Sequence, residues 1–310
     1  MKTVLGCIRR ADEDFSLIGD GDRIAVGVSG GKDSLLLLYA LSLYRKFSHK
    51  NFTLCAITLD MGLRPFDVGG IRALCEQLEV PYTLVDTQIA QVIFDIRKEQ
   101  NPCALCAKMR RGALYDAAVA QGANKVALGH HRDDVIETLL LSLVFEARLH
   151  TFHPNTYLSR TGITAIRPMV YLPEKHVIHV AKELSLPVLH NPCPADGNTK
   201  RQEMKDLLSS LSHTYPHLKE YMLKALQNRE QYGLWDKRIV GKPEEERAAL
   251  PPACAKRAAC ADSSAARCAP FLSPFALAEQ AAQRFLVLQH APHADGDAPL
   301  GVLRHAAGDL

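Results

Sequence analysis

Residues 29–34 form the hexapeptide Ser-Gly-Gly-Lys-Asp-Ser, between an apolar β-type run at 24–28 and an apolar helical run at 35–41. In a strand–glycine turn–helix arrangement, backbone N–H groups and a helix N-terminus converge on phosphate oxygens. The hexapeptide differs from the Walker loop, in which the lysine directly precedes the hydroxyl residue. The alternative is an ordinary glycine turn before a helix. The candidate phosphate-binding residues are Ser29, Gly30, Gly31, Lys32, Asp33 and Ser34.

Two cysteines, Cys103 and Cys106, stand three residues apart just before the basic run at 108–111. Near a helix start they can point the same way, beside cations that favour thiolate. They could be a redox pair, half of a zinc site or two core cysteines. A third, Cys193, follows a strand-like run at 186–189. Three cysteines without an obvious fourth favour an iron–sulfur cluster with one open iron or a Cys3His zinc site, and their spacing does not decide between them.

Acidic side chains follow a later strand. Residues 129–134 read Gly-His-His-Arg-Asp-Asp, at the end of one apolar run and the start of a helical one. Asp133 and Asp134 therefore reach the same sheet edge as the hexapeptide, where they could hold Mg²⁺ against phosphates or act as a general base. The alternative role for either is to cap the helix. We expect His130 and His131 to be structural or to orient a substrate rather than to bind metal.

The elements that must position these residues alternate between strands and helices up to about residue 190. Strands are expected at 24–28, 52–59, 82–85 and 125–128. Helices are expected at 70–79, 110–120, 133–145 and 173–183, and at 200–227 in two pieces separated near Pro216. Repeated βα units predict an α/β fold: a Rossmann-like parallel sheet with helices on both faces and ligands at the carboxyl ends of the strands.

Composition sets the limits of this prediction. We divide the 310 residues into a lead-in (1–22), an α/β domain with the cysteine site (23–215), a C-terminal helix (216–240) and an Ala-rich, disordered tail (241–310).

No apolar run approaches the ~20 residues that span a bilayer, and residues 1–6 lack a signal-peptide core, so we expect a cytoplasmic protein without membrane contact. In that reducing compartment the nine cysteines favour metal or redox roles over disulfides. The net charge of +3 is too small to indicate nucleic acid.

Taken together, the motifs resemble the tRNA 2-thiocytidine synthetase (TtcA) family of the PP-loop ATP pyrophosphatase superfamily. The likeness covers roughly residues 3–230. The hexapeptide alone implies the superfamily, which includes lysidine synthetases, GMP synthetases and thiouridylases. The matching motifs, in family order, are residues 29–34, Cys-x-x-Cys at 103–106 with Arg-Arg-Gly at 110–112, residues 129–134, Ile-Arg-Pro at 166–168 and Pro-Cys at 192–193. Many relatives have a second cysteine three residues after the last one, where this chain has Asp196.

The resemblance implies an ATP- and Mg²⁺-dependent enzyme that thiolates a tRNA base, with C2 of cytidine 32 as the first choice. The base oxygen would attack the α-phosphorus of ATP, and pyrophosphate would leave. Cys103, Cys106 and Cys193 would hold a [4Fe-4S] cluster whose fourth iron carries the sulfur. Among the other predicted roles, Lys32 stabilises pyrophosphate and Arg110 neutralises phosphate charge.

Three further residues receive roles from the same resemblance. Asp133 is the candidate for metal binding or proton transfer. Gly129 and Asp60 belong to the nucleotide site, Asp60 on the adenosine side, although a turn-forming aspartate is the alternative for Asp60. The expected partners are tRNA, a sulfur donor such as a cysteine desulfurase, and a second copy of the chain in a homodimer.

Other functions remain open at this point. The first is 2-thiouridine formation, although enzymes of that kind carry extra Cys-x-x-Cys zinc modules at their ends and this chain has none near residue 1. The second is a desulfidase that acts on free thio-bases without RNA. The third is a non-catalytic ATP-binding regulator, which the presence of Lys32, Asp33 and all three cysteines disfavours.

Overall fold

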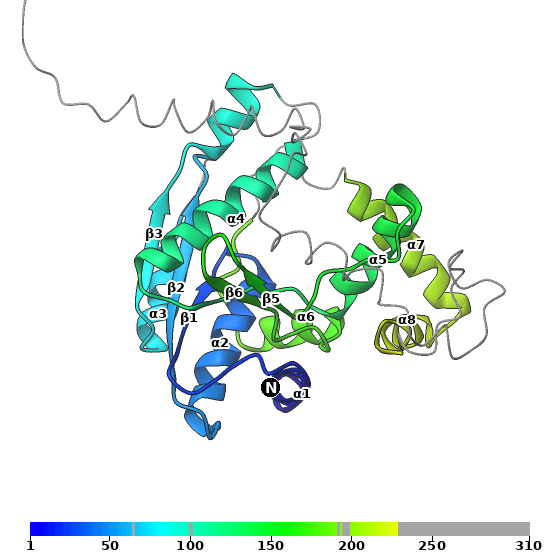
Figure 1. Cartoon of the computed structure of the whole chain (residues 1–310), viewed down its shortest axis with the longest axis horizontal. Coiled ribbons are helices and arrows are strands. Elements are labelled where there is room, and N and C mark those ends of the chain that lie inside the picture. Colours follow the sequence, from blue (N-terminus) through cyan, green and yellow to red (C-terminus); the bar gives the residue numbers. More distant parts are fainter. Residues whose placement is uncertain (64–65, 99–101, 191–192, 194–198, 229–310) are drawn as a thin grey trace, which may run out of the picture. The chain divides into compact units, whose positions relative to one another are not determined.

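A single mixed sheet forms the centre of the described part of the chain. The computed structural model describes residues 1–228 except 64–65, 99–101, 191–192 and 194–198. Within these residues, six strands follow the order β3-β2-β1-β4-β6-β5 (Figure 1). Neighbouring strands are parallel except β5, which pairs antiparallel with β6. The strands are β1 (Asp22–Gly27), β2 (Phe52–Asp60), β3 (Tyr82–Asp86), β4 (Lys125–Ala127), β5 (Asn155–Leu158) and β6 (Ile163–Ile166).

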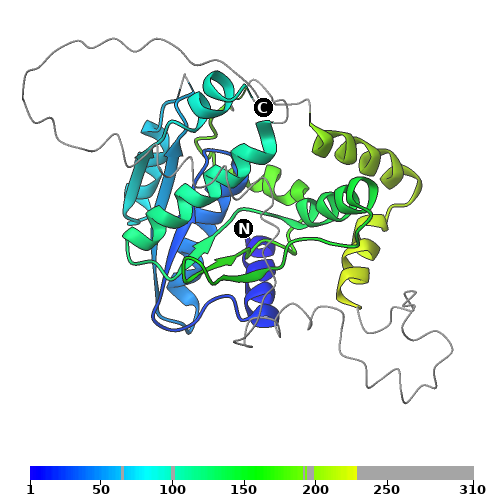
Figure 2. The same ribbon diagram turned by 45° about the horizontal axis from the view of Figure 1, so that its top comes forward.

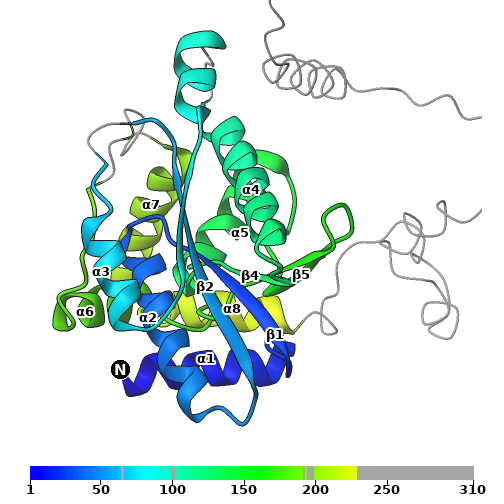
Figure 3. The same ribbon diagram turned by 90° about the vertical axis from the view of Figure 1, so that its left-hand side faces the viewer.

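Helices cover both faces of the sheet, as predicted. The described helices are α1 (Lys2–Phe15), α2 (Lys32–Phe47), α3 (Gly69–Gln77), α4 (Pro102–Ala120), α5 (Arg132–Glu146), α6 (Glu174–Glu183), α7 (Lys200–Thr214), α8 (Leu218–Gln227) and the π-helix η1 (Gln91–Ile96). Side chains of β1 alternate between two cores: Ile24 packs with α1, α2, α3 and α6, whereas Ala25 packs with Leu114 of α4. Figure 3 shows α4 across the sheet from α1, α2 and α3. None of the helices described combines the length and apolar character needed to span a bilayer.

Helices α7 and α8 both pack beside α5 (Figure 2). The two helices were predicted as one helical stretch interrupted near Pro216, and the break between Thr214 and Leu218 confirms this. The cap of α5 comes from the motif at 129–134: the His131 side chain accepts from the Asp134 N–H while Asp134 accepts from the His131 N–H.

Three sequence-based expectations were wrong. The run at 186–189 is not a strand, because the Leu189 N–H donates to the Gly30 carbonyl of the hexapeptide (2.9 Å) instead of joining the sheet. The sheet is not wholly parallel, since the hairpin β5–β6 was missed; β5 is short and its side chains alternate between exposed and half-buried, so it lacks an apolar run. The third wrong expectation is a helix boundary: the helix expected at 110–120 begins eight residues earlier, at Pro102.

Helix α1 belongs to the core, although its residues were predicted as a lead-in. Val4, Ile8 and Ala11 are fully buried against the sheet layer. Buried Asp12 then fixes the end of the helix: it accepts from the Ile18 N–H (2.8 Å), the Tyr44 hydroxyl (3.0 Å) and the Lys50 ammonium (2.7 Å). The boundaries predicted near 215 and 240 remain predictions, and the tail at 241–310 lies outside the described residues.

Replacing Asp12 by Ala is expected to destabilise the fold by about 2–3 kcal/mol, because a buried hydroxyl and a half-buried ammonium both lose their acceptor. Urea unfolding would measure the change. The control is Glu13→Ala on the same helix, which removes only an exposed pair with Arg9 and should leave stability nearly unchanged. Equal effects of the two substitutions would contradict the role given to Asp12.

Candidate functional site

The hexapeptide loop is held in shape by its own two serines. The Ser29 N–H donates to Ser34 Oγ (3.1 Å), and the Ser34 hydroxyl donates to the Gly31 carbonyl (2.9 Å). Gly30 has φ of +84°, a left-handed conformation that favours glycine. The loop therefore turns directly into the first turn of α2, whose backbone N–H groups can face an anion.

Gly129 brings the end of β4 against this loop. A Cβ atom on Gly129 would lie 3.0 Å from the Asp33 carbonyl carbon and 3.1 Å from the Ser34 nitrogen, which are backbone atoms that cannot move aside independently. The predicted membership of Gly129 in the nucleotide site thus has a steric basis. The absence of a side chain allows β4 to touch the N-terminus of α2.

Lys32 lies between two carboxylates. Its ammonium is 3.1 Å from Asp33 Oδ2 and 3.2 Å from Glu174 Oε1. Burial by itself lowers the pKa of Lys32, but the charges of Asp33 and Glu174 outweigh burial and raise the pKa above its ordinary value. Lys32 is therefore cationic at neutral pH. The other oxygen of Asp33, Oδ1, is buried without a hydrogen-bond partner in the described structure, and His131 Nε2 lies 3.6 Å from it.

The two adjacent acids of α5 have different environments. Both oxygens of buried Asp133 have structural partners: Oδ2 accepts from the Glu174 N–H (2.8 Å) and Oδ1 from the Lys219 ammonium (2.7 Å). Burial opposes ionisation of Asp133, but these two hydrogen bonds and nearby cationic charge hold its pKa below the ordinary value. Asp133 thus anchors α6 and α8 to α5, whereas Asp134 lines the pocket beside the hexapeptide.

That pocket has a volume of about 520 Å³ and gathers charged groups from four helices. Sequence reasoning placed Lys32, Asp33, His131 and the acids of α5 at one sheet edge, and the structure brings the first three together with Asp134. Glu137 of α5 also lines the pocket. Sequence reasoning missed the remaining charged residues, because α6 and α7 approach only through tertiary packing. These are Glu174, Arg201 and Lys205. The sequence signal that could have indicated Glu174 is its place directly after Pro173, at a helix start.

The two histidines of the motif are structural, as expected. His131 caps α5. The His130 ring packs against Phe152 with centroids 4.8 Å apart, and burial lowers the pKa of His130 to about 4, so the ring is neutral near pH 7.

The three cysteines predicted as one site are described by the structure, and none of them forms a disulfide with another described residue. Burial raises the pKa of Cys106, the Arg110 charge lowers it, and thiolates at Cys193 and Cys103 raise it further, which places Cys106 close to both. No three potential ligands among the described residues are arranged for a single metal ion. A [4Fe-4S] cluster separates its cysteines more widely than one ion does, because each cysteine binds a different iron.

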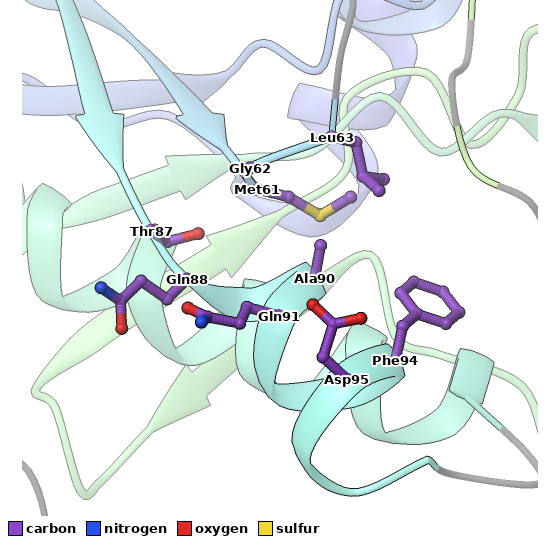
Figure 4. A pocket seen from close by; sticks show the side chains of 9 residues that line it. All are labelled: Met61, Gly62, Leu63, Thr87, Gln88, Ala90, Gln91, Phe94 and Asp95. Carbon is purple, nitrogen blue, oxygen red and sulfur yellow. The ribbon is translucent and has the colours of Figure 1, made fainter.

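Asp60 ends β2 and is buried. One carboxylate oxygen accepts from the Gly62 N–H (2.8 Å), which is the turn-forming role given as its alternative. A second pocket, of about 360 Å³, begins at the next residue, Met61, and extends to η1. Figure 4 shows Met61 opposite Ala90, with Phe94 and Asp95 beside them. The adenosine-side role of Asp60 remains a prediction.

Comparison with known proteins shows the family of this chain. A family model described as a PP-loop domain matches residues 9–210. A tRNA-cytidine(32) 2-sulfurtransferase from Pelobacter propionicus is 39% identical over 237 residues, which cover 76% of this chain and 88% of that protein. The chain belongs to the tRNA-cytidine(32) 2-sulfurtransferase family. A further family member, from Geobacter sulfurreducens, is 38% identical over 76% of this chain and 93% of its own length. The family predicted from the motifs is confirmed.

Solved structures agree with this family assignment. The U34-tRNA thiolase NcsA from Methanococcus maripaludis, determined with its [4Fe-4S] cluster, matches with a TM-score of 0.60 and 25% identity. The match covers 75% of this chain and 80% of the thiolase. The α/β fold predicted from the sequence is the fold of a tRNA thiolase.

Gly129→Ala is expected to displace the first turn of α2, because the new methyl group would meet backbone atoms. We expect a loss of about 1–3 kcal/mol of stability, the usual scale of overpacking, and ATP binding at least tenfold weaker. Thermal unfolding and titration calorimetry with ATP would measure the two effects. Gly6→Ala is the control: nothing lies within 4 Å of its Cβ, so helix α1 should become slightly more stable and ATP binding should not change. Unaltered ATP affinity in Gly129→Ala would contradict the steric argument.

Proposed function

We propose that this chain uses ATP to convert cytidine 32 of tRNA into 2-thiocytidine. The observation that carries the proposal is the link between the phosphate loop and the cysteine site. Leu189 donates to the Gly30 carbonyl and packs against Gly30, and Cys193 follows four residues later. Four residues span at most about 14 Å. Because the Cys106 thiol neighbours that of Cys193, the thiols lie within reach of a nucleotide held at the loop.

The chain's own residues support adenylylation of the base. The base oxygen attacks the α-phosphorus, the bond to the bridging β-phosphate oxygen breaks, and pyrophosphate leaves. Lys32, kept cationic by its neighbours, and the N–H groups at the start of α2 stabilise the charge on the leaving group. When the activated base later loses its oxygen, that oxygen departs with AMP. We keep Arg110 as the group that neutralises phosphate charge from the side of α4.

Mg²⁺ fits the acids of the pocket. Asp33 Oδ1 is a buried acceptor that receives no hydrogen bond from the described residues, and carboxylate oxygens are preferred ligands of this ion. We propose that Asp33 and Asp134 hold Mg²⁺, which would supply Lewis-acid stabilisation of the phosphates. Asp133, the residue first predicted for this role, is not among the residues that line the pocket, and it positions Glu174 and Lys219 instead.

A [4Fe-4S] cluster fits the cysteine site, since three neighbouring thiols leave one iron open. We propose Cys103, Cys106 and Cys193 as its ligands. Arg110 favours the thiolate form of Cys106 that binds iron. When bound, the cluster supplies the iron that carries the sulfur destined for the base.

Exposed cations next to the cysteines favour a tRNA substrate. Lys108, Arg110 and Arg111 are exposed on the first half of α4, and Arg97 and Lys98 are exposed at the end of η1, which contacts α4. We propose that four of them, Arg97, Lys98, Lys108 and Arg111, bind phosphates of the anticodon loop, from which the target base is unstacked. We also propose that the protein is cytoplasmic, that a cysteine desulfurase supplies its sulfur, and that it forms a homodimer.

A second candidate is 2-thiouridine formation, because the solved structural neighbour is a U34-tRNA thiolase. We prefer cytidine 32 as the target base, because this chain is 39% identical to a cytidine-32 enzyme and 25% identical to that thiolase.

The tRNA nucleosides of a strain that lacks this protein should contain no 2-thiocytidine, and this nucleoside should return when the parent gene is restored. With purified protein the products should be AMP and pyrophosphate, and Lys32→Ala should slow their formation by roughly 10²–10³. Mass spectrometry and nucleotide chromatography measure these outcomes. Loss of 2-thiouridine would favour the second candidate, and ADP as product would refute the reaction class.

Replacing Cys103, Cys106 or Cys193 by Ala is expected to remove the cluster, because each thiolate binds a separate iron. Anaerobic reconstitution of the parent should give about four irons per chain with a broad visible absorbance. The control is Cys7→Ala on α1, where the thiol contacts the Tyr171 carbonyl, and iron content should stay at the parent level. ATP binding should persist in all four variants. Stoichiometric zinc without visible absorbance would rule out the cluster.

A further inference from the structure

The pocket beside Lys32 is a place where four helices begin. Its lining includes residues of the first turns of α2, α5, α6 and α7, whose N-caps are Gly31, His131, Pro173 and Thr199. Each helix start contributes partial positive charge from backbone N–H groups. The pocket therefore has a positive background before any side chain is counted.

Two ammonium groups in this pocket share one carboxylate oxygen. Glu174 Oε1 is 3.2 Å from the Lys32 ammonium and 2.9 Å from that of Lys205, which comes from α7. Burial alone would raise the pKa of Glu174, but the hydrogen bond from Lys205 and the charges of both lysines lower it. Because the two ammonium groups share one carboxylate oxygen, they can together bind an anion that has more charge and more oxygens than one carboxylate.

A third cation of α7 reaches the same pocket. Arg201 Nη1 lies 3.2 Å from Asp134 Oδ1 and 3.1 Å from Glu137 Oε2. Glu137 is buried, and burial together with the Asp134 charge raises its pKa. Arg201 is therefore needed as a counterion in the ligand-free protein, yet its guanidinium remains in a pocket that is open to ligands.

We propose that Lys205 and Arg201 of α7 bind the pyrophosphate that leaves ATP, together with Lys32 of the hexapeptide. The inference rests on the proposed AMP- and pyrophosphate-forming reaction and adds a binding surface outside the hexapeptide. On entry the phosphate oxygens replace Glu174 Oε1 as the partner of both lysines. The Glu174 backbone stays in place because Asp133 accepts its N–H, so only the side chain moves.

The test measures binding of inorganic pyrophosphate with Mg²⁺, and separately of AMP, to the full-length protein with its cluster by titration calorimetry. Lys205→Met removes the charge but keeps the apolar stem, and should weaken pyrophosphate binding about tenfold or more without changing AMP binding. The control is Lys200→Met on the same helix, where the ammonium pairs with exposed Glu203 and both affinities should stay at parent values. Arg201→Lys keeps a cation beside Glu137 and should also weaken pyrophosphate binding while the protein remains folded.

A further variant separates ligand binding from a purely structural role. Glu174→Gln neutralises the competing carboxylate and should bind pyrophosphate several-fold more tightly than the parent; weaker or equal binding would contradict the exchange. Parent-level pyrophosphate affinity in Lys205→Met would overturn the proposal, while formation of AMP and pyrophosphate would leave the proposed function standing. Conversely, a parent protein that binds pyrophosphate through Lys205 but never splits ATP would refute the function and keep this site.

Discussion

The first turn of α2 lies so close to residue 129 that a side chain there would force backbone atoms to shift. A Cβ atom there would meet the backbone of Asp33 and Ser34. This contact joins the segment after β4 to the start of α2, and the residues that follow Gly129 begin the next helix. His131 caps α5, and Asp133 holds the first N–H of α6. A single close approach thus sets the origin of three helices around one pocket.

Within that pocket, charge is balanced without a ligand. Cations from α2 and α7 pair with carboxylates from α2, α5 and α6, so no buried charge is left without a partner of opposite sign in the pairs described. The carboxylates beside Lys32 raise its pKa, so this lysine stays charged in the ligand-free protein. In the proposed pyrophosphate complex these carboxylates compete with phosphate, so the ion pairs of α7 would set how strongly the anion binds.

The phosphate loop and the cysteine site meet through backbone rather than through side-chain chemistry. Leu189 donates to the Gly30 carbonyl, and its side chain occupies the space that a Cβ at position 30 would need. Cys193 is carried by this segment and Cys106 by α4, on the other face of the sheet from α2. In the proposed mechanism this link lets sulfur and nucleotide chemistry act on one base.

The sequence alone indicated the hexapeptide, the order of most strands and helices, and the family, because these depend on local residue patterns and on apolar runs. The sequence favoured Asp133, and only the tertiary structure shows that Asp134 lines the pocket while Asp133 pairs with Glu174 and Lys219, because neighbouring helix positions face different partners. It also missed Glu174, Arg201 and Lys205, which come from helices distant along the chain. Those residues reach the site through tertiary contacts, and ion pairs between distant helices leave no periodic signal in a sequence.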